Sequence, residues 1–407
     1  MRHYLPEAAG KSWGYVRDHC HGLLLVDGAG RDDYHRPLQF VLNPATRWVA
    51  PLPLRRPPHV KVNSCEDRYL AYGPAVSPHY QVVSVTRFLC KREPGDIFYD
   101  RPNYQLDPAV ERSEWPPSVY TLHVLSSRTG RWEETPFARQ GGAAGTVADM
   151  RHSPPHEKRN AVYWRGALYV HCQTDFVMRI SLSDDEYRVI KPPMSIRASD
   201  CPQFYLGRSQ KGVYCASLRG QARIRVWKLE ESGCEGRWVL RHDKDLYELL
   251  KHRINGGVVQ GRPWILQDIN CNYREYEQDD DTKPLVDERS EWSSEASVDD
   301  RFAWSSDNED EVSERGYSGC VVRSILGFHP YKLIIFLSES ITTGMAYHLN
   351  SSRMEALGNL YPGRYNDELP NGRFITSAFP YTPCWIKHIG GSKDSIEHLH
   401  QVSISMK

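Results

Sequence analysis

The amino-acid sequence predicts an all-β fold built from repeated small units rather than from one large core. The chain has 407 residues, beyond the roughly 250–300 residues at which a single hydrophobic core stops growing. Aromatic residues make up 11% of it, with 11 Trp and 23 Tyr against 7 Met, which suits the half-buried surface of pleated sheets. A strand–turn–strand theme recurs at intervals of roughly 40–50 residues, which is typical of a kelch-like β-propeller with four-stranded blades.

Apolar runs closed by turn residues predict most strands in order along the chain. Residues 21–30 end in a Gly-rich turn, and residues 37–53 contain a strand, an Asn-Pro turn and a second strand that ends at prolines. Further strands are predicted within 79–90, 118–137, 160–172, 175–193, 210–240, 318–340 and 343–358. Long helical periodicity is almost absent, and residues 244–254 are the best helix candidate.

The recurring theme indicates how the strands are ordered within each unit. Its copies are VLNPATRWVAPLP, VLSSRTGRWEETPF, RISLSDDEYRVIKPP, VWKLEESGCEGRWVL and AYHLNSSRMEALG. We expect the polar loop of each copy to join the last two strands of a blade, and the aromatic residue after it to anchor the outer strand. If Trp132 or Trp238 is a fully buried anchor, its replacement by Ala should cost about 3–5 kcal/mol. The period accommodates about six blades.

The stretch NAVYWRGALYVHC, residues 160–172, predicts a hairpin with Arg165-Gly166 as a two-residue turn. In that register Trp164 faces Ala167, and Gly166 supplies the positive φ that such a turn requires. The alternation makes the aromatic residues part of a blade core. Arg165 would then be exposed and a candidate for partner contact.

Charge is unevenly distributed along the chain, although the formal net charge is zero. Residues 277–314 contain fifteen Asp or Glu and three Lys or Arg, a net −12, which leaves +12 for the rest. No run of five basic residues occurs, so we expect no nucleic-acid partner. We expect residues 275–315 to be a disordered acidic insertion between two strands. Trp292 and Trp304 within it leave a short partner motif or a phosphorylation site as the alternative.

Cysteine spacing and the absence of apolar segments indicate the compartment. The ten Cys are scattered without a C-x-x-C pair, as expected of buried thiols in a reducing environment. The N-terminal residues lack an apolar signal region, and no stretch approaches the roughly 18 apolar residues of a membrane span. We therefore expect a cytoplasmic or nuclear protein without membrane association.

Enzyme signatures fail along the whole chain. AGKS lacks the first Gly of a phosphate loop, GAGRDD lacks the third Gly of a dinucleotide fingerprint, and G-x-S-x-G and H-E-x-x-H are absent. The pairs His19/His21 and His398/His400 could each reach one metal from a strand, but ordinary strand-end histidines are the favoured interpretation. We therefore expect no catalytic, cofactor-binding or metal-binding residues and no cofactor.

Three cysteines and the FHPYK motif are also interpreted as structural rather than catalytic. The contexts of Cys172, Cys215 and Cys320 favour small core residues over nucleophiles. In FHPYK, residues 328–332, Pro330 favours a strand start or a bulge over a catalytic role for His329.

In their order along the chain, these segments resemble the F-box-associated β-propeller family of plants, which is expanded in grasses. The matching elements are RDHCHGLLLV, VLNPATRWVAPLP, YQVVSVTRF, YTLHVLSSRTGRWEE, AVYWRGALYVHC, VMRISLSDDEYRVIKPP, YLGRSQKGVYCASL, RVWKLEES, ILGFHPYKLIIFL, AYHLNSSRMEALGNLYP and FPYTPCW. The resemblance implies an N-terminal segment over 1–14, the propeller over 15–390 with the acidic loop 275–315 inside it, and a C-terminal tail over 391–407.

The resemblance also implies a function. In this family the propeller recognises the substrate of a cullin-RING (SCF-type) ubiquitin ligase, and a preceding F-box docks on a Skp-type adaptor. Residues 1–14 do not resemble an F-box, so adaptor and cullin are expected partners only if an F-box lies upstream. We expect a non-enzymatic, protein-binding propeller whose target and binding loops are unknown. The alternatives are a stand-alone interaction propeller, not linked to ubiquitination, and an enzyme on a propeller scaffold.

Overall fold

The computed structural model describes most of the chain from residue 16 onward. The described residues are 16–31, 37–55, 64–91, 106–152, 160–193, 203–209, 211–220, 222–232, 235–255, 322, 324–338, 343–359, 379–386 and 389. Residues 1–14, 275–315 and 391–407, for which sequence expectations were given, lie outside this part, as do Cys320, His398 and His400. Within it, no helix is long and apolar enough to cross a membrane.

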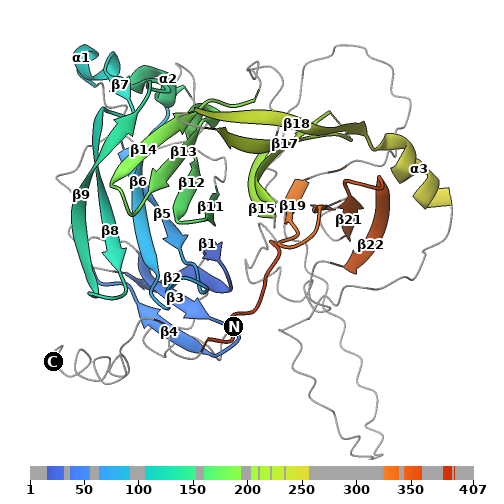
Figure 1. The fold of residues 1–407 in the computed structure, drawn as a ribbon, viewed down its shortest axis with the longest axis horizontal. Helices are drawn as coiled ribbons and strands as arrows, with labels where there is room; N and C mark the ends of the chain where they lie inside the picture. Colours follow the sequence, from blue (N-terminus) through green and yellow to red (C-terminus); the bar gives the residue numbers. More distant parts are fainter. Residues whose placement is uncertain are drawn as a thin grey trace, which may run out of the picture.

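The described strands form five antiparallel units of four strands, which follow one another around a central axis (Figure 1). Blade 1 contains β1 (Val16–Cys20), β2 (Leu23–Arg31), β3 (Pro37–Asn43) and β4 (Trp48–Pro51). Blade 2 contains β5 (Ser64–Ala71), β6 (Gln81–Phe88), β8 (Val119–Ser126) and β9 (Arg131–Gln140). Blade 3 contains β11 (Ala161–Trp164), β12 (Ala167–His171), β13 (Val177–Ser181) and β14 (Glu186–Ile190).

The remaining strands complete the ring. Blade 4 contains β15 (Gln203–Ser209), β16 (Gly212–Arg219), β17 (Arg223–Ser232) and β18 (Glu235–Asp245), and blade 5 contains β19 (Ser324–Phe328), β20 (Ile334–Ser338), β21 (Thr343–His348) and β22 (Arg353–Asn359). The predicted all-β propeller is confirmed, and five of the about six expected blades lie within the described residues.

Blades 2 and 3 share one eight-stranded sheet. Their outer strands β9 and β14 pair in parallel, with Tyr187 opposite Arg139, whereas every other strand pair within the blades is antiparallel. This pairing continues the sheet from one blade into the next and removes two exposed sheet edges.

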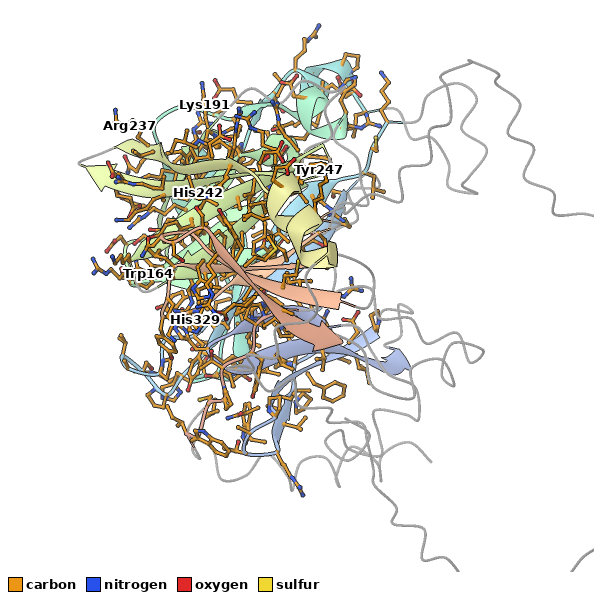
Figure 2. The ribbon with its side chains drawn as sticks, turned by 90° about the vertical axis from the view of Figure 1, so that its right-hand side faces the viewer. Trp164, Lys191, Arg237, His242, Tyr247 and His329 are labelled. Atoms are coloured by element: carbon orange, nitrogen blue, oxygen red, sulfur yellow. The ribbon has the colours of Figure 1, made fainter. Side chains whose placement is uncertain are left out.

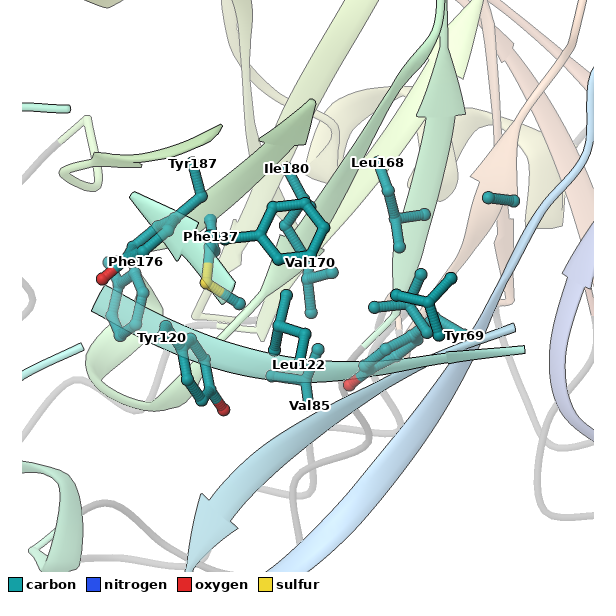
Figure 3. Close-up of a cluster of buried hydrophobic side chains, with 14 of the residues drawn as sticks. Tyr69, Val85, Tyr120, Leu122, Phe137, Leu168, Val170, Phe176, Ile180 and Tyr187 are labelled. Atoms are coloured by element: carbon teal, nitrogen blue, oxygen red, sulfur yellow. The ribbon is translucent and has the colours of Figure 1, made fainter. Parts of the chain in front are cut away.

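Buried side chains lie between neighbouring blades, so each blade completes the core of the next. The largest cluster lies between blades 2 and 3 and includes Tyr69, Leu122, Phe137, Val170 and Tyr187 (Figure 3). Separate clusters join blades 1 and 2, blades 3 and 4, and blades 4 and 5. A chain of this length therefore needs no single large core.

The five copies of the recurring theme occupy the expected place. In every blade the polar loop joins the third strand to the fourth. In four blades the residue directly before the fourth strand has a positive φ, namely Arg47, Gly130, Asp185 and Ser352. This conformation ends the polar loop and starts the outer strand with the correct twist.

The predicted hairpin at residues 160–172 is confirmed. Trp164 pairs with Ala167, Tyr163 with Leu168 and Val162 with Tyr169. Arg165 and Gly166 have φ values of 47° and 83°, which is the signature of a type I′ turn. The guanidinium of Arg165 lies 5.4 Å from the ring centroid of Trp164, so the exposed turn carries a cation over an aromatic face.

The proposed aromatic anchors differ in burial. Trp132 and Trp238 are only partly buried, so the condition for a loss of 3–5 kcal/mol is not met at either. Trp132 instead lies at the edge of blade 2, where its indole N–H donates to the carbonyl of Pro53 and Arg68 lies 5.0 Å from its ring centroid. In blade 3 the equivalent aromatic residue, Tyr187, is 1% exposed, because the pairing of β9 with β14 covers it.

Three inner strands, β1, β5 and β15, and most of the short elements were not predicted. β1 and β5 contain Asp18, His19, Asp67 and Arg68, so they lack the apolar alternation of an ordinary strand. The predicted helix exists as α3 (Tyr247–Asn255), and it begins later than expected because β18 continues to Asp245. The short elements α1 (Pro108–Glu111), β7 (Glu114–Trp115), β10 (Gly145–Thr146), α2 (Val147–Arg151) and η2 (Gln173–Asp175) lie between strands.

Candidate functional site at the propeller axis

The first strands of the five blades, β1, β5, β11, β15 and β19, surround the axis and end on the same side of the ring (Figure 1). We call this end the axial face; its described residues are 20–22, 72–80, 164–166, 208–209, 211, 329–333 and 379–386. Trp164 and His329, from blades 3 and 5, accordingly lie toward one edge of the molecule in side view (Figure 2).

Hydrogen bonds between blades hold the axial face together. The thiol of Cys20 donates to the carbonyl of Tyr72 at 3.3 Å, and Nδ1 of His21 lies 2.6 Å from the same oxygen. Ser209 donates to the carbonyl of Lys332 at 3.0 Å. These contacts link blade 1 to blade 2 and blade 4 to blade 5, so the strand ends stay together at the axis.

Residues 379–386 bridge blades 5 and 1. The ring of Phe379 stacks on His19 at a centroid distance of 4.2 Å, and Pro380 lies against Gly327 of β19. Cys384 is 7% exposed, and its carbonyl accepts a hydrogen bond of 2.8 Å from Asn43. The C-terminal segment is therefore the piece that joins the last blade to the first.

Cys20 and His21 are uncharged at neutral pH. Burial raises the pKa of the Cys20 thiol to about 12, with a further contribution from Asp18. Burial and the nearby charge of Arg208 lower the pKa of His21 to about 4. Because Nδ1 of His21 faces a carbonyl oxygen, that nitrogen carries the proton. Cys20 is therefore not a thiolate nucleophile at neutral pH.

Arg208 is a cation whose charge acts on both members of this pair. It lies on β15, is half-buried, and acts electrostatically on Cys20, His21 and Tyr331. Burial lowers the pKa of its guanidinium, which nevertheless remains a cation. Among the described residues, no side chain or backbone group forms a hydrogen bond or an ion pair with it. An unpaired half-buried cation is energetically costly, so a site whose described residues supply no anion for Arg208 favours one from a ligand.

Exposed aromatic rings also lie on the axial face. Tyr331, Tyr381 and Trp385 are 60%, 38% and 73% exposed. Tyr381 is positioned by a 3.3 Å hydrogen bond to the carbonyl of Gly22. Rings of this type are the commonest anchors of protein–protein interfaces. None of them was predicted as a site residue, because neither their exposure nor their proximity is visible in the sequence.

Of the histidine and cysteine candidates, His19, His21, Cys172 and Cys215 lie within the described residues, where they make structural contacts. His19 stacks on Phe379 while His21 turns away with a φ of 45°, and the described residues contain no group of three potential metal ligands. Cys215 is fully buried in the core between blades 3 and 4, as predicted, and Cys172 is partly buried.

The FHPYK motif forms the turn between β19 and β20. Nδ1 of His329 accepts hydrogen bonds from the backbone N–H groups of Tyr331 and Lys332 at 3.0 and 3.1 Å. Pro330 follows the end of β19 instead of starting a strand, and the bulge lies earlier, between Ile325 and Gly327. The structural interpretation of His329 therefore holds, with the position of Pro330 corrected.

The lowered pKa of His21 predicts a loss of stability in acid. The pKa of a histidine in the unfolded chain is near 6.5, whereas the pKa of His21 in the folded protein is about 4, so the folded state favours the neutral imidazole. The stabilisation that neutral His21 contributes to the folded state is fully present above about pH 6.5. It is lost as the pH falls from about 6.5 toward 4, by an amount on the order of 2 kcal/mol. We expect His21→Asn, which tolerates a positive φ and retains a donor, to reduce this loss. Urea unfolding of both proteins at several pH values measures it, and parallel pH profiles would contradict it.

Comparison with known proteins gives distant structural similarity alone. No protein-family model matches the chain, and no curated protein matches it. Among solved structures, it is similar to the GH43 protein BlXynB from Bacillus licheniformis, at 6% identity and a TM-score of 0.28 over 56% of this chain and 42% of that one. A variant of that protein matches at 7% identity with the same coverage and TM-score. A Bacteroides uniformis protein named for 6-phosphogluconolactonase matches at 15% identity and a TM-score of 0.24, over 53% of this chain and 66% of that one.

The expectation that this chain is not an enzyme is corrected by these matches. The three solved structures named above carry the names of enzymes, and the match spans less than half of the GH43 chains. The expectation that the chain is not an enzyme rested on the absence of linear catalytic motifs from the sequence. A propeller, however, brings residues from distant segments together at its axis, as with His21 and Arg208. Similarity of this size assigns no reaction or substrate.

Proposed function

We propose that this chain is a protein-binding propeller that resembles the substrate-recognition part of an F-box protein in a cullin-RING ubiquitin ligase. The observation that carries the binding role is the group of exposed rings on the axial face, Tyr331, Tyr381 and Trp385. They lie on the turn after β19 and on residues 379–386, at the end of the ring where loops from several blades meet, and such a surface can offer the roughly 800 Å² per partner of a stable interface.

The ligase part of the proposal is supported by the order of the segments. Each copy of the recurring theme that carries the family resemblance joins the third and fourth strands of one blade. The recognised protein would bind the axial face, and ubiquitin transfer would be carried out by other subunits of the ligase.

Affinity capture with matched variants tests the binding role. We expect Trp385→Ala combined with Tyr331→Ala to lose the captured protein, with affinity at least about 30-fold lower, because an anchoring aromatic contributes roughly 2 kcal/mol or more. Leu54→Ala is the matched control, since Leu54 is 65% exposed but lies in the connection from blade 1 to blade 2. Equal recovery with the double variant and with the intact chain would reject the axial face as the binding surface.

A grafted F-box tests the ligase part separately. We expect a chain with an F-box placed before residue 1 to assemble with a Skp-type adaptor and a cullin, and to direct ubiquitination of the captured protein. If the assembly forms and the captured protein remains unmodified, the ligase part is rejected while the binding role stands.

A further inference from the structure

Arg208 differs from the described arginines that form ion pairs with carboxylates. Ten arginines lie within ion-pair distance of a carboxylate: Arg17, Arg55, Arg87, Arg139, Arg151, Arg179, Arg223, Arg225, Arg241 and Arg353. Arg208 is half-buried and has no such partner among the described residues. The groups around it are the thiol of Cys20, the imidazole of His21 and the phenol of Tyr331. None of these supplies a carboxylate.

The surrounding loops strengthen the positive charge. Arg165, Lys211 and Lys332 are exposed on the turns that follow the first strands of blades 3, 4 and 5. The described residues of the axial face contain no Asp or Glu. An anion approaching the axis therefore meets cations from three blades and, among the described residues of the axial face, no carboxylate, which favours its association.

Aromatic surface adjoins these cations. Tyr331 is close enough to Arg208 to interact with it electrostatically, and it is 60% exposed. Trp385, at 73% exposure, presents a second large ring on the same face. A ligand that suits the face therefore carries both a carboxylate and an apolar side chain. Peptides can combine the two within a few residues.

We infer that the axial face binds an acidic peptide segment of a partner protein, with one carboxylate paired to Arg208 and an adjacent apolar side chain packed on Tyr331 and Trp385. The planar guanidinium can hold a carboxylate through two parallel hydrogen bonds. Arg165, Lys211 and Lys332 would attract further acidic residues from the rim. This inference rests on the proposed binding function, and it specifies the chemistry of the partner.

Fluorescence anisotropy with the full chain tests the inference. The probe is a labelled twelve-residue peptide of Glu, Asp and one central Trp, and the comparison peptide replaces each Glu and Asp with Gln and Asn. We expect the acidic probe to bind, the neutral peptide to bind roughly ten-fold or more weakly, and Arg208→Gln to lose a similar factor for the acidic probe. Arg208→Lys should retain part of the affinity, because it keeps the charge and loses the bidentate geometry.

The matched control is Arg112→Gln, which removes an exposed cation from the connection between β6 and β8, at the end of blade 2 opposite to the axial face. Equal binding of both peptides, or equal binding by the intact chain and Arg208→Gln, would overturn the inference. A single-stranded oligonucleotide that binds as tightly as the acidic probe would overturn the choice of a peptide. Tighter binding by a chain lacking residues 277–314 would assign the face to this protein's own acidic segment and overturn the partner assignment.

The two proposals fail in different ways. If Trp385→Ala with Tyr331→Ala abolishes partner capture and Arg208→Gln leaves it unchanged, the acidic-peptide inference fails and the binding function stands. If none of these variants changes capture, both fail. Because Arg208 has no hydrogen-bond or ion-pair partner within the described residues, its replacement by Gln should not lower the temperature of thermal unfolding.

Discussion

Replacing Tyr187 with Ala is expected to lower the free energy of unfolding by about 4 kcal/mol. The side chain is 1% exposed, and its ring meets that of Tyr120 edge to face at a centroid distance of 6.0 Å (Figure 3). Its hydroxyl donates to the carbonyl of Pro117. Truncation leaves a cavity at the junction of blades 2 and 3 and also removes a buried hydrogen bond, so both losses add.

Two variants separate these contributions. Tyr187→Phe keeps the ring and leaves the Pro117 carbonyl without its donor, so we expect a smaller loss of about 1–2 kcal/mol. Tyr331→Ala removes a ring that is 60% exposed and should change stability by less than about 0.5 kcal/mol. Urea unfolding followed by tryptophan fluorescence measures all three. A loss below about 1.5 kcal/mol for Tyr187→Ala would show that the joint between blades 2 and 3 does not carry the expected energy.

Replacing Gly22 with Ala is expected to destabilise the ring by about 3 kcal/mol. Gly22 has a φ of +87°, and an added Cβ would lie 2.6 Å from the backbone N of Cys384 and the carbonyl oxygen of Thr382. Both atoms belong to the backbone of the segment that bridges blades 5 and 1, so relieving the clash means moving that segment away. The expected result is a lower melting temperature together with greater protease sensitivity near residues 379–386.

Gly166→Ala is the control for Gly22→Ala. Gly166 occupies the equivalent turn of blade 3 with a nearly identical φ of +83°, but an added Cβ would meet nothing within 4 Å. We therefore expect only the cost of the positive φ, about 1 kcal/mol. Equal losses for the two variants would mean that the C-terminal segment does not press on Gly22 and that it contributes little to ring closure.

Local chemistry explains which elements were predictable. The third-to-fourth strand loops were located correctly in all five blades, because their turn residues and the flanking alternation are local features. The turn at Arg165-Gly166 was predicted down to its pairing register for the same reason. β1 and β5 were missed, because a first strand at the axis carries polar residues such as Asp18 and Arg68, which obscure the period of two.

The candidate site could not be derived in the same way. Cys20, Arg208 and Trp385 come from blade 1, blade 4 and the C-terminal segment, and no sequence spacing relates them. Their proximity depends on how successive blades rotate around one axis, which is settled by packing between blades. The burial of Tyr187 likewise depends on the parallel pairing of β9 with β14, whereas the similar loops before Trp132 and Trp238 lead to half-buried rings.

The sequence by itself determined the class of fold, the order of strands within each blade and the positions of the turns, because these follow from short-range periodicity and backbone preference. Only the tertiary structure decided that Arg208 is half-buried with no carboxylate partner among the described residues, that Tyr331 and Trp385 lie at the same end of the ring, and that residues 379–386 join the last blade to the first. Burial and charge pairing depend on which distant segments meet, and that is a property of the assembled ring.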